Sequence, residues 1–174
     1  MIIKNVDRYE IDKIKNIDRS EIVENIYYYQ NGKLVKEKEF YDIRGWDKNE
    51  LAKNLKKLKK LHDRGGSFIG AFDSERLVGI GALENRFIGE NLDTLQLVFL
   101  HVGKPFRKKG IGTELMEKLC IIAREKGAKK LYISATPSEN TVNFYLNRGC
   151  YLAKKVIKEL YEEEPEDIHL ELEL

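Results

Sequence analysis

Residues 97–113 constrain the fold of this chain more than any other stretch, and they read LVFLHVGKPFRKKGIGT. Apolar residues 97–102 form a strand pattern. A short basic loop with Gly110 and Gly112 leads from it directly into an amphipathic helix pattern. Such a loop directs several backbone N–H groups, and the positive end of a helix dipole, at one point. The segment therefore predicts a binding site for a phosphate or diphosphate at this helix N-terminus.

The basic loop is compatible with two interpretations. Its glycines allow positive φ and close approach of a ligand, and Arg107, Lys108 and Lys109 add positive charge at the same point. A Gly-X-Gly before a helix also occurs in tight strand–helix turns that bind nothing. The loop lacks the Gly-Lys-Ser/Thr of a P-loop and the third glycine of a dinucleotide fingerprint, which disfavours both of those nucleotide-binding classes.

Composition narrows the class of protein. The 174 residues are 42% hydrophobic and 34% charged, with a formal net charge of +2, so no strong field favours nucleic acid or an anionic membrane. No stretch approaches the ~18 apolar residues of a membrane span, and the first residues lack a signal-peptide pattern. The two cysteines have no metal-ligand spacing. We therefore expect a cytoplasmic protein without a metal, a nucleic-acid partner or a membrane partner.

The rest of the pattern predicts an α/β (α+β) layer fold with a mixed sheet in one domain, residues 1–174. A β-hairpin is expected over residues 22–29 and 34–41, because Asn31-Gly32 is a strong two-residue turn. The acidic run 162–167 is expected to be a solvated loop. Further strands are expected at residues 2–6, 67–72, 77–87, 94–102, 130–136, 151–156 and 168–172, and helices after Asp7, Asp47, Gly110 and Ser138.

Ligands of such sheets bind at the carboxyl ends of strands. The ends of the strands at 94–102 and 130–136 are therefore where a site is expected. Two motifs lie at these ends. Residues 107–112 read RKKGIG, and residues 144–151 read FYLNRGCY.

Together these motifs resemble those of the GCN5-related N-acetyltransferase (GNAT) family, Arg/Gln-x-x-Gly-x-Gly/Ala and Phe-Tyr-x-x-x-Gly-Phe. The resemblance covers residues 96–151 and implies a GNAT-like domain with a mostly antiparallel central sheet flanked by helices, here with an N-terminal β-hairpin. It also implies acetyl-CoA as cosubstrate and two central strands that splay apart.

The resemblance assigns coenzyme contacts residue by residue. The strand end would bind the pantetheine arm in a strand-like manner, through backbone groups of Leu100 and Val102 around His101. The loop would bind the diphosphate. An Asn that family members often carry seven residues before the motif's Tyr is replaced by Ser138, and Asn140 follows two residues later. The loop residues assigned to the diphosphate are Arg107, Lys108, Lys109, Gly110, Ile111, Gly112 and Thr113.

The resemblance also suggests catalytic roles. Tyr145 matches the family's general acid, which returns a proton to the leaving thiolate; the alternative is a buried aromatic that only packs. The position where many members carry a base, eleven residues before Arg107, is Gln96, which accepts no proton at neutral pH. Glu84, on the preceding predicted strand, is the first candidate base and His101 the second, with a core histidine as the alternative for His101.

These observations predict an N-acetyltransferase that transfers the acetyl group of acetyl-CoA to a primary amine by direct attack in a ternary complex. The expected acceptor is a small molecule. No activated Cys or Ser constellation is visible, and Cys120 and Cys150 are interpreted as structural. The alternatives are an acyl-CoA-binding module with impaired catalysis, acetylation of a protein amine, and a purely structural domain. Asp18, Glu21 and tyrosines 27–29 either line a pocket for a cationic acceptor or pack. The sequence leaves monomer and homodimer open.

Overall fold

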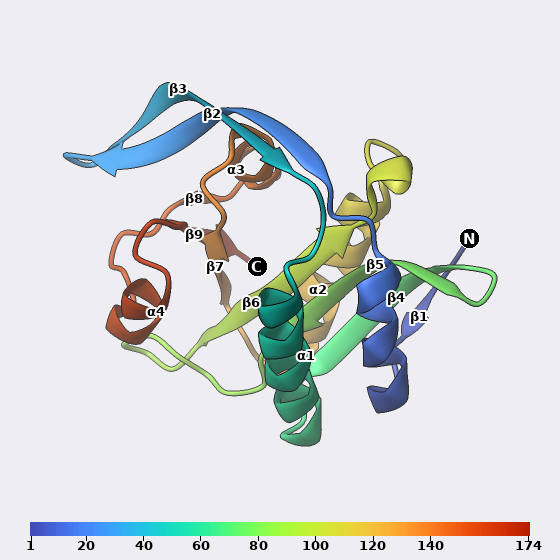
Figure 1. Ribbon diagram of the computed structural model, residues 1–174. Helices are drawn as coiled ribbons and strands as arrows, with labels where there is room; N and C mark the ends of the chain where they lie inside the picture. The colour runs from blue at the N-terminus through green and yellow to red at the C-terminus, as the bar shows by residue number, and fades with distance from the viewer.

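The computed structural model describes residues 1–174. Seven strands form one mixed sheet in the order β1-β4-β5-β6-β7-β9-β8 (Figure 1). All neighbours in this sheet are antiparallel except β6 and β7, which confirms the predicted fold class. The strands are β1 (Ile2–Asn5), β4 (Ser67–Asp73), β5 (Arg76–Leu83), β6 (Thr94–Val102), β7 (Lys130–Ala135), β8 (Tyr151–Leu152) and β9 (Ile168–Glu173).

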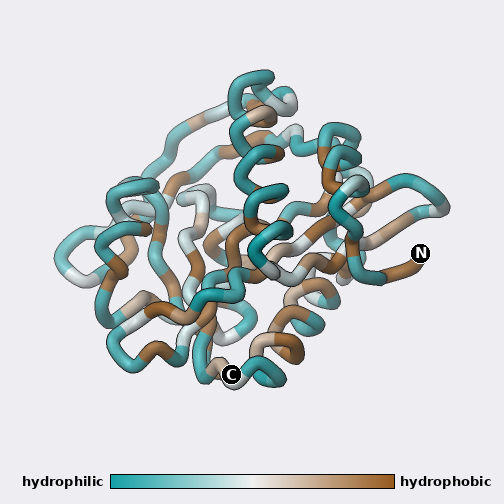
Figure 2. The backbone as a smooth tube through the Cα atoms, turned by 90° about the horizontal axis from the view of Figure 1, so that it is seen from below, coloured by the Kyte–Doolittle hydropathy of each residue, from teal (hydrophilic) through white to brown (hydrophobic).

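Helices cover both faces of this sheet. The 3₁₀ helix η1 (Arg8–Asn16) and α1 (Lys48–Asp63) lie on one face, and α2 (Ile111–Glu125) and α3 (Glu139–Leu146) lie on the other (Figure 1). Two buried clusters fill these layers, and hydrophobic residues gather along the central strands (Figure 2). The short α4 (Lys158–Glu163) precedes β9.

The central strands β6 and β7 separate part-way along their length. They pair only where Thr94, Leu95 and Gln96 face Lys130, Leu131 and Tyr132. Beyond this point β6 pairs only with β5, and β7 only with β9. The register of β5 with β6 shifts at the same level, because Ala82 faces Phe99 but Leu83 faces Leu97. This bulge at Val98 bends β6 away from β7.

The predicted hairpin forms a second, two-stranded sheet of β2 (Glu21–Gln30) and β3 (Lys33–Ile43). Asn31 and Gly32 have φ of 50° and 80°, the signs that a type I′ turn requires. The hairpin lies between η1 and α1 in the sequence, and it passes over α3 toward β8 in space (Figure 1). The hairpin, which separates the two helices of one layer in the sequence, thus reaches α3 in the opposite layer.

Four details differ from the sequence-based expectation. The first helix is 3₁₀, and the spacing of three between Ile11, Ile14 and Ile17 suits its three-residue turn. The strand expected at 77–87 ends at Leu83, and the one expected at 151–156 pairs with β9 over only two residues. The acidic segment is partly helical, because α4 covers residues up to Glu163 and Tyr161 packs its ring on His169.

Candidate active site

The loop from the end of β6 to the first turn of α2, residues 103–113, is called the glycine loop below. It contains a 3₁₀ turn, η2 (Lys104–Phe106), and then two left-handed residues, Lys108 with φ 60° and Gly110 with φ 83°. A Cβ at Gly110 would meet no atom within 4 Å, so the backbone conformation favours glycine here and crowding does not. The loop ends where the N–H groups of the first turn of α2 lack helical partners, which suits an anion.

The last glycine of the loop, Gly112, is favoured by close packing. A Cβ at Gly112 would lie 3.2 Å from the ring of Phe144, so this glycine lets the N-terminus of α2 approach α3. The two sequence motifs therefore meet in space. The predicted loop residues Ile111 and Thr113 lie in the same turn of α2.

The edge of β6 that faces the gap carries free backbone groups. The N–H of Gly103 binds the carbonyl of Val78 at 2.8 Å, so Gly103 is directed at β5. Because backbone groups alternate along a strand, those of Val102 and Leu100 point to the opposite side, toward the gap. The Nε of Arg107 donates to the Val102 carbonyl at 2.9 Å. The remaining groups of this edge suit an extended, amide-bearing ligand.

The side chain of His101 lies on the face of the sheet that η1 and α1 cover. Its ring packs on Phe99 and Trp46, with centroid distances of 4.4 and 5.5 Å. Burial, aided by the charges of Arg19 and Arg107, lowers the pKa of His101 to about 4, so its imidazole is neutral at pH 7. This environment is that of a packed histidine, and it leaves His101 a weak proton acceptor.

Tyr145 lies in α3 and is 6% exposed, with its ring edge-to-face on Phe144. Burial raises its pKa above the ordinary value for a tyrosine, so the phenol stays protonated at neutral pH. A general acid requires that state. Burial likewise raises the pKa of Cys150 to about 12 and also raises that of Cys120, so neither thiol is an activated nucleophile.

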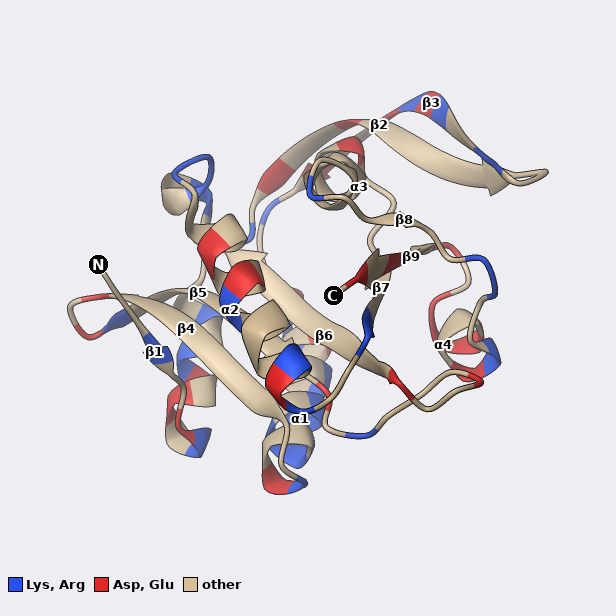
Figure 3. Cartoon of the chain, turned by 180° about the vertical axis from the view of Figure 1, so that it is seen from behind, with Lys and Arg blue, Asp and Glu red and all other residues tan.

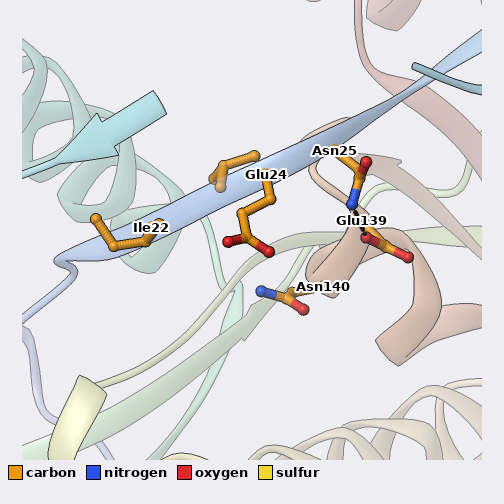
Figure 4. A pocket seen from close by; sticks show the side chains of 6 residues that line it. Ile22, Glu24, Asn25, Glu139 and Asn140 are labelled. Atoms are coloured by element: carbon orange, nitrogen blue, oxygen red, sulfur yellow. Dashed lines mark hydrogen bonds between the residues drawn. The ribbon is translucent and has the colours of Figure 1, made fainter. Parts of the chain in front are cut away.

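Ser138 and Asn140 both lie at the start of α3, and both side chains are hydrogen-bonded within the chain. Ser138 is 3% exposed and donates its hydroxyl to Thr141 at 2.9 Å. Asn140 is exposed and donates its amide to Glu21 at 3.2 Å. A pocket of about 60 Å³ lies beside them, lined by Ile22, Val23, Glu24, Asn25, Glu139 and Asn140 (Figure 4).

Gln96 is the last residue of β6 that pairs with β7, so it stands where the two strands part. Glu84 is adjacent, since its N–H binds the Gln96 carbonyl at 2.9 Å. The Glu84 carboxylate accepts bonds from Arg64 at 3.2 and 2.6 Å and from the Asn85 N–H at 3.0 Å. Burial alone would raise the pKa of Glu84, but these hydrogen bonds outweigh burial and lower it. Glu84 is therefore an ionised carboxylate next to the point of divergence.

One residue of this region was not singled out from the sequence. The Nε of Arg148 donates to Thr113 at 3.1 Å, its Nη1 donates to the Phe144 carbonyl at 2.6 Å, and its guanidinium lies 3.6 Å from the centroid of the Phe144 ring. No carboxylate forms an ion pair with it. The spacing of four between Phe144 in α3 and Arg148 in the turn that follows the helix is the available signal. Arg148 thus brings a positive charge to the first turn of α2.

Comparison with known proteins decides the family. A family model described as the acetyltransferase (GNAT) family matches residues 24–150, which include most of the hairpin, the glycine loop and α3. The chain belongs to the GNAT family. An uncharacterised N-acetyltransferase of Schizosaccharomyces pombe is 34% identical to this GNAT chain over 55 residues, or 32% of the chain. The match spans only 38% of that relative's length.

Solved structures share the GNAT fold over nearly the whole chain. Nourseothricin acetyltransferase gives a TM-score of 0.71 at 16% identity, covering 99% of this chain and 97% of its own. An aminoglycoside 6'-N-acetyltransferase complexed with coenzyme A gives 0.67 at 15% identity, with coverages of 99% and 97%. The PaiA N-acetyltransferase of Thermoplasma acidophilum, also in complex with coenzyme A, gives 0.65 at 16% identity and covers both chains fully. None of the helices has both the length and the apolar character of a membrane span.

Proposed function

We propose that this GNAT protein transfers the acetyl group of acetyl-CoA to a primary amine of a small molecule by direct attack. The observation that carries the proposal is the parting of β6 and β7 beyond Gln96 and Tyr132. On one side of the resulting gap lie the glycine loop and a free strand edge, and on the other side lies α3 with Tyr145. These are the parts that hold an anionic, amide-bearing thioester and protonate its leaving group.

The residues present fit coenzyme A as a substrate. Its diphosphate suits the N–H groups of residues 108–113 and the charges of Lys108, Lys109 and Arg148. Its pantetheine amides suit the edge groups of Leu100 and the N–H of Val102. The Val102 carbonyl is not assigned to the coenzyme, because it already accepts a hydrogen bond from Arg107.

The reaction then proceeds in one ternary complex. The amine nitrogen forms a bond to the thioester carbonyl carbon, and the tetrahedral intermediate collapses with cleavage of the C–S bond. Tyr145 gives its hydroxyl proton to the departing sulfur and regains one from solvent. Glu84, ionised by its pair with Arg64, accepts the amine proton through a water. Both thiols of the chain stay out of the chemistry.

We propose that the acceptor is a cationic small molecule bound on the side of the hairpin. Acidic residues lie on β2, α3, β9 and the α4 segment (Figure 3). Glu24 has no ion-pair partner and points toward Asn140 across the small pocket (Figure 4). The names of two structural neighbours, nourseothricin acetyltransferase and aminoglycoside 6'-N-acetyltransferase, give small-molecule acceptors for those proteins. This likeness supports the same class here.

Gln96 favours one alternative, a coenzyme-binding module with impaired catalysis. Gln96 occupies the position where the family's base is common, and the carboxylate of its backbone neighbour Glu84 is in an ion pair with Arg64. Acetylation of a protein amine is the other alternative. We further propose one domain of residues 1–174 in the cytoplasm, because Cys120 and Cys150 are both free thiols, as a reducing compartment requires.

Two measurements test this function. Calorimetric titration with acetyl-CoA is expected to give saturable heat, and no heat contradicts a coenzyme site. Release of the free thiol is then followed with a panel of polyamines, aminoglycosides and lysine-containing peptides. Turnover with a small polycation supports the proposal. Binding without turnover by any amine supports the impaired module, and turnover with peptides alone supports a protein acceptor.

A further inference from the structure

The segment that leads into the hairpin is bonded to the glycine loop. The N–H of Lys104 binds the carbonyl of Asp18 at 2.8 Å. The guanidinium of Arg107 spans two carbonyls, with Nε on Val102 at 2.9 Å and Nη1 on Ser20 at 3.1 Å. Ser20 directly precedes β2. Arg107 therefore joins the free edge of β6 to the base of the hairpin.

Strand β2, which follows Ser20, is also bonded to the other side of the gap, at the segment between β7 and α3. The N–H of Tyr27 binds the carbonyl of Pro137 at 2.8 Å, and Ile26 forms an isolated antiparallel bridge with Ser138. The Tyr27 hydroxyl donates to Asn143 at 2.8 Å. Strand β2 thus connects the loop after β6 with the segment after β7, the two chain segments whose strands have ceased to pair with each other.

We propose that Arg107 is a positioning residue that couples the coenzyme site to the hairpin, so that coenzyme binding orders the acceptor side. The inference rests on the proposed function. Arg107 pairs with no carboxylate, and its guanidinium is held by the carbonyls of Val102, five residues away, and Ser20, 87 residues away. A diphosphate held by the glycine loop would fix that loop, and the guanidinium would carry the restraint to Ser20. By linkage, an acceptor that orders the hairpin strengthens coenzyme binding equally.

Trp46, the only tryptophan, is a natural reporter of this coupling. It follows β3 at the exit of the hairpin, and its Nε1 donates to the Ile17 carbonyl at 3.0 Å. The guanidinium of Arg19 lies 4.8 Å from the ring centroid, and Phe99 stacks at 6.3 Å. A change in order at residues 17–20 therefore changes the surroundings of the indole.

The test uses the full chain and coenzyme A as the probe, with calorimetry, Trp46 fluorescence and amide hydrogen exchange. In the wild type, saturating coenzyme A is expected to slow exchange of β2 amides by about fivefold or more, the lower end of typical coupling, and to shift Trp46 emission with the calorimetric affinity. Arg107→Met removes both bonds and is expected to lose these hairpin responses. Arg107→Lys keeps a positively charged donor group and should retain part of these hairpin responses. Lys109→Met is the matched control, since it removes equal charge from the same loop without touching the hairpin.

The outcomes separate the two proposals. Absence of coenzyme binding to the wild type refutes the proposed function, and this inference with it. Binding without hairpin protection in the wild type, or undiminished protection in Arg107→Met, overturns the coupling alone. Loss of protection in Lys109→Met at saturating coenzyme also overturns it, because charge would then explain the effect. If Arg107→Met does not fold, Arg107→Lys decides, and full wild-type protection in that variant contradicts the proposal.

Discussion

The glycine loop and the hairpin flank the same gap between β6 and β7. Main-chain groups shape the glycine loop, whereas side chains hold the hairpin in place. The glycine loop depends on main-chain geometry, with positive φ at Lys108 and Gly110 and the unpaired N–H groups of α2. The hairpin is fixed to α3 largely through side chains, with Asn25 bonded to Glu139 at 2.7 Å and Tyr27 bonded to Asn143. A coenzyme shared by a family can be bound mainly by backbone groups, with a few positive side chains around them, whereas a particular acceptor needs specific side chains.

This difference also separates the two regions energetically. Backbone N–H groups titrate in no pH range and keep their direction whatever the side chains are. The hairpin contacts include the ion pair of Lys36 with Glu139 at 3.1 Å, whose partners are 49% and 28% exposed. Pairs of this exposure contribute about 0–1 kcal/mol. The hairpin side is therefore the more easily changed.

The largest effect is expected at the backbone of the glycine loop. Gly110→Asp puts a side chain at φ 83° and a negative charge beside the proposed diphosphate. We expect coenzyme affinity to fall by about thirtyfold or more, since strain and repulsion each contribute about 1–2 kcal/mol. Calorimetric titration measures the change. Gly110→Asn is the matched control, because it has nearly the same shape, tolerates positive φ and has no charge; equal affinity of the Asp variant and wild type would contradict the site.

Tyr145→Phe tests the proposed general acid in α3, the helix that contacts both the glycine loop and the hairpin. Loss of a general acid is expected to lower kcat by at least about tenfold. Coenzyme affinity should change little, because the ring is buried and the phenyl group keeps its packing. Steady-state thiol release measures kcat, and the unfolding midpoint shows whether packing is intact. Unchanged turnover would remove Tyr145 from the mechanism.

The sequence was sufficient where local rules decide the structure. Asn31-Gly32 specified the hairpin turn, and the helix expected after Asp47 forms, with Asp47 capping α1 by accepting the N–H of Glu50 at 3.0 Å. Long-range partners were beyond such rules. Nothing in the sequence around Glu84 shows that Arg64 binds it, and nothing near Ser20 shows that Arg107 reaches it. The motifs predict where a site lies, but tertiary packing determines which partners these side chains bind.

Glu84→Gln tests proton acceptance beside the point where β6 and β7 part. We expect kcat to fall about fivefold at pH 7, below the usual range for a direct base because a water intervenes, and less at pH 9, where more of the amine is already deprotonated. Stability should fall by about 1 kcal/mol at pH 7 through loss of the pair with Arg64. Since the folded-state pKa of Glu84 is lowered, its contribution exists above the ordinary carboxyl pKa and disappears as pH falls through the folded value. Equal kcat in both proteins at pH 7 would leave Glu84 only a structural role.

The smallest effect is expected from the hairpin, and it is the one that distinguishes the two regions most directly. Tyr27→Phe removes only the hydroxyl that bonds Asn143, worth about 1 kcal/mol. We expect KM for the acceptor amine to rise about threefold to fivefold, with a smaller change in coenzyme affinity in the absence of acceptor. Tyr29→Phe is the control, because Tyr29 is 60% exposed and makes no hydrogen bond through its hydroxyl. If Tyr27→Phe instead weakened coenzyme binding and left KM for the amine unchanged, the hairpin would belong to the coenzyme side, and side chains would shape that side as well.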